Sequence, residues 1–307
     1  MADWIEPAQR FVHYAALLGL FGWTAFRVVG LRGLPWLPRD DGRSAMLVLA
    51  IAAPILSLGL MLASIATMMG QPIAALDWSM VQEMTLGTAI GWAFLVRCAL
   101  LVAALAVLFA RSSTPALAVA ASCYALSLVT LGWSGHAAAT DGSLGLFQRL
   151  SDGAHLLASG LWLGAIGWFL HLAISAHREP GRIPAKPLVA VMHAFFPLGV
   201  TLVTVVAVTG LINAQLIFGL ENGVGILSTW YGLLLATKVA LVVGMLVLGA
   251  GNARTGRRAV AAAATEGADE AIALRTLRRS LAWEFGLGLG VIALVAVLGM
   301  LSPMPMD

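Results

Sequence analysis

Charged residues are scarce in this chain, since Asp, Glu, Lys and Arg together make up only 11% of its 307 residues. A soluble domain carries charge on about a quarter of its residues, so the composition excludes a soluble globular protein. Hydrophobic residues make up 60% of the sequence instead, and the mean hydropathy is +0.91. The sequence therefore predicts an all-α, polytopic membrane protein that sits in a lipid bilayer.

Cysteine is also scarce, and several familiar motifs are missing. The two cysteines, Cys98 and Cys123, both lie in apolar runs and form no CxxC pair. Their placement excludes a disulfide framework and the intramembrane thiolate motif of ATP-driven metal pumps. The chain has no GxxxxGKS/T, HExxH or GxSxG motif, so nothing indicates nucleotide binding or hydrolysis. We therefore expect a protein that is not an enzyme.

Long apolar runs dominate what is present. A helix needs about 20 apolar residues to span a membrane, and the sequence contains eight such runs. Their approximate bounds are residues 9–31, 45–69, 82–110, 115–134, 151–174, 190–218, 229–252 and 281–301. Each run is expected to be helical, because backbone polar groups in lipid must be satisfied within the segment.

Basic residues gather in alternate loops, and this pattern predicts the orientation. Fourteen of the 18 Lys and Arg residues lie in the first, third, fifth and seventh loops. Such loops stay in the cytoplasm, so we expect both termini on the extracytoplasmic side. The net charge of +3 follows from these loops and indicates no nucleic-acid partner. Acidic residues precede Arg10 near the N-terminus, so we expect no cleaved signal peptide.

The two halves of the chain resemble each other. The third and seventh runs each place a glycine six residues before a cation, Gly91 before Arg97 and Gly232 before Lys238. The first and fifth runs each carry a histidine near the outer end, and the second and sixth each carry a proline. Four spans per half preserve orientation, so we predict a parallel 4+4 internal repeat. The predicted halves are residues 1–142 and 143–307 of one membrane domain.

Three histidines are predicted near the outer face, namely His13, His136 and His155. An ionisable side chain within a span is costly and marks a candidate functional site, although a histidine bonded inside a bundle would also be tolerated. We interpret the three as a metal site in the outer half of the membrane. In this interpretation His13 and His155 come from matching helices and meet at the interface of the two halves, where the metal crosses.

Methionine decides which metal the histidines favour. Imidazole suits several transition metals, whereas thioether selects Cu(I). Met300, Met304 and Met306 lie at the end of the chain, and the last two belong to a proline-containing polar tail that has no core to fill. The pattern favours copper as the ligand, as Cu(I) rather than Cu(II), with these methionines as further ligands.

Two residues flank His155 at helical spacing. Asp152 lies three residues earlier and could orient the imidazole or simply suit the start of a helix. Trp162 lies seven residues later and could wall the site or pack against lipid.

Three further polar side chains fall in or beside the spans. Arg97 and Lys238 lie deep enough to make snorkelling to the interface awkward. Glu284 lies near Arg278 and Arg279, and a structural ion pair is the plainer interpretation of that residue.

Six segments, taken in order, resemble the copper resistance protein D (CopD) family of bacterial membrane proteins. They are RFVHYAALLGLFG (Arg10–Gly22), SGHA (Ser134–Ala137), SDGAHLLASGLWLG (Ser151–Gly164), VTGLINA (Val208–Ala214), STWYGLLLATKVAL (Ser228–Leu241) and LRRSLAWEFGLG (Leu277–Gly288). The resemblance implies an eight-helix inner-membrane protein that handles copper, often beside a periplasmic copper-binding partner of the CopC type. It places the family-defining core at about residues 190–300. The motif residues carried over are His13, His136, Asp152 and His155, with Asn213, Tyr231, Lys238 and Glu284 in roles that the resemblance does not assign.

We interpret the chain as a copper permease without its own energy source. The competing interpretation is a membrane cytochrome in which two histidines on facing helices hold haem b between them. A third is a subunit that docks a periplasmic copper chaperone and moves no metal.

Overall fold

The computed structural model describes residues 4–32, 34, 37–38, 41–111, 113–134, 142–179, 185–262 and 268–302, with the backbone alone for residues 185–186, 255–262 and 268–273. The described residues are helical almost throughout and contain no β-strand.

Eight long helices make up the bundle. They are α1 (Ile5–Val29), α2 (Arg43–Met69), α4 (Ala89–Ala110), α5 (Thr114–Val129), α6 (Gly142–Arg178), α7 (Ala185–Phe218), α9 (Trp230–Ala262) and α10 (Ala268–Leu298). Each is long and apolar enough to cross a membrane, α5 together with the 3-10 turn η2 (Thr130–Trp133) that continues it. The prediction of an all-α bundle with eight spans is confirmed.

The prediction of one continuous helix over residues 82–110 is wrong. A separate helix, α3 (Trp78–Gly87), ends before Thr88, which is extended at φ −122° and ψ 152°. The Thr88 hydroxyl accepts a hydrogen bond from the amide of Gly91 at 3.0 Å and so caps the start of α4. Helix α9 begins in the same way, because the Thr229 hydroxyl accepts from the amide of Gly232 at 3.1 Å. It follows η4 (Leu220–Asn222) and the short α8 (Gly223–Ile226).

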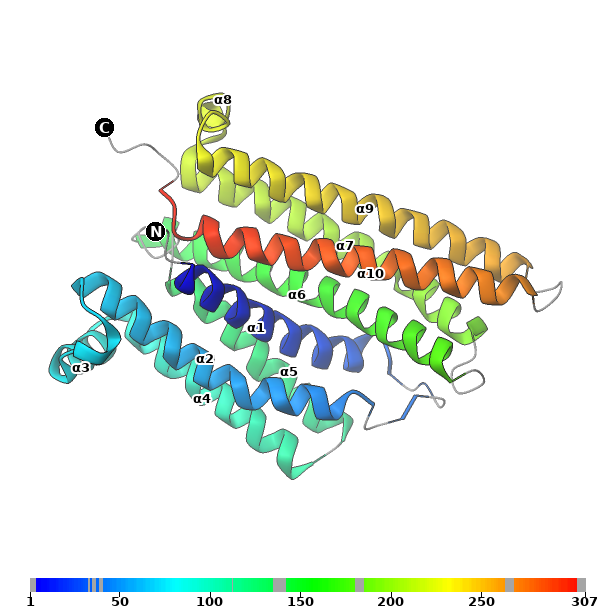
Figure 1. Ribbon diagram of the computed structural model, residues 1–307, viewed down its shortest axis with the longest axis horizontal. Coiled ribbons are helices and arrows are strands. Elements are labelled where there is room, and N and C mark those ends of the chain that lie inside the picture. Colours follow the sequence, from blue (N-terminus) through cyan, green and yellow to red (C-terminus); the bar gives the residue numbers. More distant parts are fainter. Residues whose placement is uncertain are drawn as a thin grey trace.

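The helices form two rings of four. In the first half α1 contacts α2, α2 contacts α4, α4 contacts α5, and α5 returns to α1. In the second half α6, α7, α9 and α10 follow the same order and also close. Helices α1 and α6 join the two rings at the centre of the bundle (Figure 1). Figure 1 also shows that α1 begins and α10 ends at one end of the bundle, which we call the terminal end.

Glycine brings α1 and α6 into backbone contact. A Cβ atom on Gly22 would lie 2.8 Å from the Cα atom of Gly164 and would collide with the carbonyl oxygen of Gly160. Glycines spaced four apart allow helices to approach this closely in membranes. At this depth, therefore, no space is left between α1 and α6, and the expectation that metal crosses at the interface of the halves is not met there.

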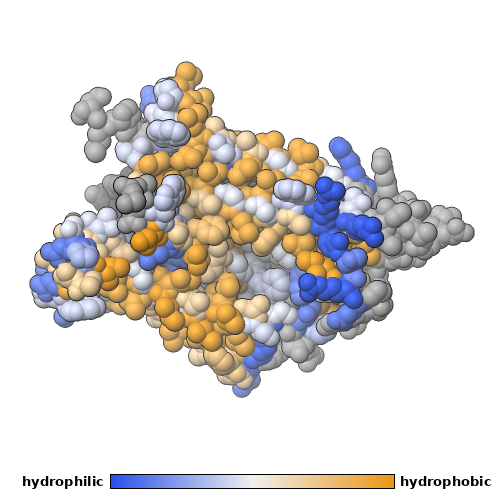
Figure 2. Space-filling view, in the orientation of Figure 1, coloured by the Kyte–Doolittle hydropathy of each residue, from blue (hydrophilic) through white to orange (hydrophobic). Residues whose placement is uncertain are grey.

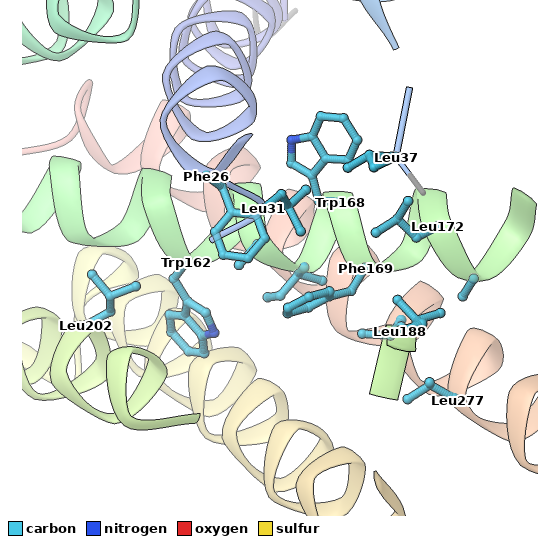
Figure 3. Close-up of a cluster of buried hydrophobic side chains, with 14 of the residues drawn as sticks. Phe26, Leu31, Leu37, Trp162, Trp168, Phe169, Leu172, Leu188, Leu202 and Leu277 are labelled. Atoms are coloured by element: carbon cyan, nitrogen blue, oxygen red, sulfur yellow. The ribbon is translucent and has the colours of Figure 1, made fainter. Parts of the chain in front are cut away.

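Apolar side chains cover both the interior and the flanks. Figure 2 shows apolar surface along the sides of the helices, with hydrophilic residues gathered mainly at the end opposite the terminal end. Large exposed apolar residues include Val48, Ile55, Val102 and Val247, as expected for helices that face lipid. Inside, Phe26 of α1 and Trp168 and Phe169 of α6 belong to a buried cluster that also includes Leu202 of α7 and Leu277 of α10 (Figure 3).

Candidate functional site: two histidine clusters

His13 lies fully buried in the first ring. Its side chain projects from α1, and its Nε2 atom lies 2.8 Å from the hydroxyl oxygen of Ser57 on α2. Its other ring nitrogen, Nδ1, is buried and has no hydrogen-bond partner among the described residues. A buried nitrogen without a partner is unusual in proteins. It leaves one position on the imidazole free to bind a ligand.

Arg97 adds a positive charge to this cluster. The side chain comes from α4 and is only 6% exposed. Its guanidinium donates to the hydroxyl of Thr130 at 2.8 Å and to the carbonyl of Thr130 at 3.3 Å. It is close enough for its charge to act on the His13 ring. The 3-10 turn at the end of α5 therefore holds a cation beside the buried histidine.

His155 occupies a similar position in the second ring. Its Nδ1 atom lies 3.0 Å from the hydroxyl oxygen of Thr209 on α7. That hydroxyl donates its single hydrogen to the carbonyl of Val205 at 2.6 Å, so its oxygen accepts from His155 Nδ1–H. A neutral imidazole with its proton on Nδ1 keeps a lone pair on Nε2. The Nε2 atom is therefore the nitrogen that can bind a metal.

Lys238 and a carboxylate complete the second cluster. Lys238 projects from α9 and is close enough for its charge to act on His155, and the charge of Asp152 acts on Lys238 in turn. The Asn213 side-chain amide also lies 3.5 Å from an Asp152 oxygen, at the limit of a hydrogen bond. The structure thus brings together four residues singled out from the sequence: Asp152, His155, Asn213 and Lys238.

The two clusters share one composition. Each takes a histidine from the first helix of its ring, a hydroxyl from the second and a cation from the third. The histidines and cations were predicted from the sequence, whereas Ser57, Thr209 and Thr130 were not. The available signal was a small hydroxyl inside an otherwise apolar span.

The two imidazoles do not face each other. His13 and Gly22 are nine residues apart, as are His155 and Gly164, and nine residues of helix turn through roughly 900°, which places them on opposite faces. Because the glycines hold α1 against α6, each histidine points away from that contact and toward its own ring. A single metal shared by both rings, or a haem held between them, does not fit this arrangement.

The remaining predicted ligands lie elsewhere. His136, Met304 and Met306 fall outside the described residues, and Met300 follows the end of α10 with 41% of its surface exposed. Trp162 does not face lipid: it is 8% exposed, packs in the core (Figure 3) and also lines a cavity of the second ring. In the described part of the chain, no group of three or more His, Cys, Asp or Glu residues could hold a metal.

The expected ion pair of Glu284 with Arg278 or Arg279 is absent from the described residues. The carboxylate instead accepts a hydrogen bond from the side-chain amide of Asn252 on α9, at 3.1 Å. Its side chain faces into the bundle and is 3% exposed, whereas Arg279 on the same helix is exposed. The helical phase of α10, which the sequence neighbours do not reveal, separates these charges.

Comparison with known proteins places the chain in a family. The sequence profile described as "Copper resistance protein D-like, N-terminal domain" matches residues 1–146, and that described as "Copper resistance protein D" matches residues 189–298. The chain is also 30% identical to Copper resistance protein D of Pseudomonas syringae pv. tomato, over 99% of this chain and 98% of that protein. The chain belongs to the copper resistance protein D family. The resemblance inferred from the six sequence segments is confirmed.

A second relative extends the family comparison. Copper transport protein CutJ of Bacillus subtilis (strain 168) is 32% identical over 124 residues, which are 40% of this chain and 21% of that protein. No solved structure gives a significant match. The prediction of a multi-pass membrane protein related to copper resistance is confirmed.

Proposed function

We propose that this protein is a copper permease of the bacterial inner membrane, with both termini on the periplasmic side. The observation that carries the proposal is the pair of histidine clusters, one in each ring, on helices apolar enough to span the membrane. Membership of a copper resistance family supplies the metal.

The two rings are the halves of a parallel internal repeat. The same ring order, the same threonine cap before α4 and α9, and the same histidine–hydroxyl–cation composition support this proposal. A parallel repeat keeps both histidines at the same side of the membrane. Copper arriving from the periplasm would therefore meet one cluster in each half.

The free nitrogens would hold Cu(I). Nδ1 of His13 and Nε2 of His155 are the ligand positions, and the hydroxyls of Ser57 and Thr209 orient the rings through the other nitrogen. Thioether sulfur selects Cu(I), so Met300, Met304 and Met306 would deliver that ion to the histidines. A separate periplasmic protein of the CopC type would supply the copper.

Arg97 and Lys238 keep the sites weak enough for transport. A cation beside each histidine opposes the binding of a second cation, so copper is held less tightly than at a storage site. Conduction requires binding that permits release. The membrane potential would drive entry, because it is worth about 2.3 kcal/mol per charge per 100 mV.

Copper uptake into vesicles tests the proposal. Purified protein is reconstituted into liposomes that contain a Cu(I) chelator, and Cu(I) uptake is measured with an imposed potential, negative inside. We expect wild-type vesicles to accumulate copper and the double variant His13→Ala/His155→Ala to accumulate no more than empty vesicles. His177→Ala, at the exposed end of α6, is the control and should keep wild-type uptake. Unchanged uptake by the double variant would contradict the proposal.

A further inference from the structure

The second ring forms a cavity that opens partly to the surface, on the side of the histidine cluster away from the terminal end. It has a volume of about 290 Å³ and is lined by residues of α6, α7, α9 and α10. The walls are mainly apolar, and the polar and sulfur-bearing residues among them include Met192, His193, Thr204, Met245, Asn252 and Glu284. A water molecule occupies about 30 Å³ in the liquid, so the cavity has room for an ion with several waters.

Glu284 brings a carboxylate to this apolar space. Its one hydrogen-bond donor in the described structure is the neutral amide of Asn252, and it makes no ion pair with a described residue. A carboxyl group inside a membrane is either protonated or balanced by an opposite charge or a metal. No described side chain makes an ion pair with Glu284, so the carboxylate form calls for a cation that enters the cavity.

Thioether and imidazole side chains line the same cavity as the carboxylate. Met245 on α9 is 4% exposed and Met192 on α7 is half-buried, and both line the cavity. His193, also on α7, lines it with an exposed side chain. Gly249 keeps the space beside Glu284 open, because a Cβ atom at that position would approach the carboxylate oxygen to 3.3 Å. Thioether and imidazole select a soft transition-metal ion rather than sodium or magnesium.

The cavity lies next to the His155 cluster along helices α6 and α9. Trp162 follows His155 by seven residues on α6, and Met245 follows Lys238 by seven residues on α9. Seven residues are two helical turns, so each pair shares one face and is separated by roughly 10 Å. Both Trp162 and Met245 line the cavity. The two helices that carry His155 and Lys238 therefore also line the cavity, two turns farther from the terminal end.

We infer that this cavity is a second binding station for Cu(I), in which Glu284 supplies the negative charge and Met192 and Met245 supply thioether ligands. The inference rests on the proposed function and extends it, because it assigns the passage of copper to the second ring. Asn252 is a positioning residue that holds the carboxylate toward the cavity.

Cu(I) titration of the purified full-length protein tests the inference. The probe is Cu(I) buffered with bicinchoninate, and the readout is the number of copper ions bound per chain. The parent is the His13→Ala/His155→Ala variant, so that the two histidine clusters do not contribute to the number of copper ions bound. We expect the parent to bind one more copper ion than the same chain with Glu284→Gln. Gln keeps the size of Glu and can still bond Asn252, and circular dichroism checks that the helices are retained.

A second variant guards against an effect of Glu284 on folding. Met192→Leu/Met245→Leu preserves volume and apolar character, and in the parent background it should lose the same copper ion. Met46→Leu, in the packed core of the first ring, is the matched control and should lose none. Equal copper binding by the parent, the Glu284→Gln variant and the double methionine variant would overturn the inference. That outcome leaves the proposed function standing, because vesicle uptake and its loss in the double histidine variant are measured separately.

Discussion

The two rings carry similar histidine clusters but differ in what lies beneath them. The difference is visible at the residues that lie seven positions, or two helical turns, from each cluster residue on the side away from the terminal end. In the first ring these are Leu20, Ala50 and Ala104, and each is at most 1% exposed and packed in one cluster. In the second ring, the corresponding positions from His155, Thr209 and Lys238 are Trp162, Leu202 and Met245. Two of these three line the cavity. Similar clusters therefore lie next to tightly packed side chains in one half and next to a cavity in the other.

The positive charge near each histidine also differs between the two rings. Arg97 is held by the hydroxyl and carbonyl of Thr130 and makes no ion pair with a described residue. Lys238 lies near Asp152, whose negative charge offsets it. A cation approaching His155 thus meets a smaller net positive charge than one approaching His13. The comparison teaches that duplication of a site does not give both copies the same role, since the surroundings decide where a bound ion can go next.

Single histidine variants give the sharpest contrast between the rings. We expect His155→Ala to lower the initial rate of vesicle copper uptake about a hundredfold, as for loss of a metal-site residue. His13→Ala should lower it far less, because the side chains two turns from His13 are tightly packed. Equal losses in the two single variants would contradict the difference between the rings.

The glycine contact that joins the rings is the next feature to break. Gly22→Ala should lower the free energy of unfolding by about 2 kcal/mol, the usual cost of overpacking, and so lower the melting temperature. The reason is that the added Cβ atom would meet the backbone of α6. Gly286→Ala is the matched control, since that glycine also belongs to a GxxxG pair, Gly286 with Gly290, yet has nothing within 4 Å of its added Cβ atom. It should leave the melting temperature in detergent unchanged. A loss of stability as large at Gly286 as at Gly22 would count against the α1–α6 crossing.

Much of the fold could be predicted from the sequence. Apolar runs of membrane length are governed by a strong constraint, the need to satisfy backbone groups in lipid, so all eight spans were found. The break at Thr88 was missed because α3 is itself apolar enough to extend the run, and only the threonine cap and the following Gly91 mark the boundary.

The site was predicted less completely than the fold. The position of a residue in an apolar run indicates its depth in the membrane, but it does not indicate the direction in which the side chain points. His13 and His155 each lie on the first helix of a four-helix ring, but the direction of each imidazole depends on which face of its helix packs against the partner helix. The nine-residue spacing to Gly22 and Gly164 contained that information once the glycines were known to touch. The Glu284–Asn252 bond joins residues 32 positions apart in the chain, and no local pattern indicates it.

Site-specific cross-linking tests most directly whether each ring holds its own histidine site. In a background with Cys98→Ala and Cys123→Ala, cysteine pairs are introduced at positions 13 and 57, 155 and 209, and 13 and 155, and the protein is treated in membranes with a short bifunctional thiol reagent. A direct disulfide needs Cβ atoms about 4 Å apart, whereas His13 and His155 reach their hydroxyl partners through ring nitrogens, so the reagent bridges the additional distance. Our account predicts rapid cross-linking of the first two pairs and none between positions 13 and 155. Efficient cross-linking of that third pair would show that the imidazoles meet between the rings and would contradict it.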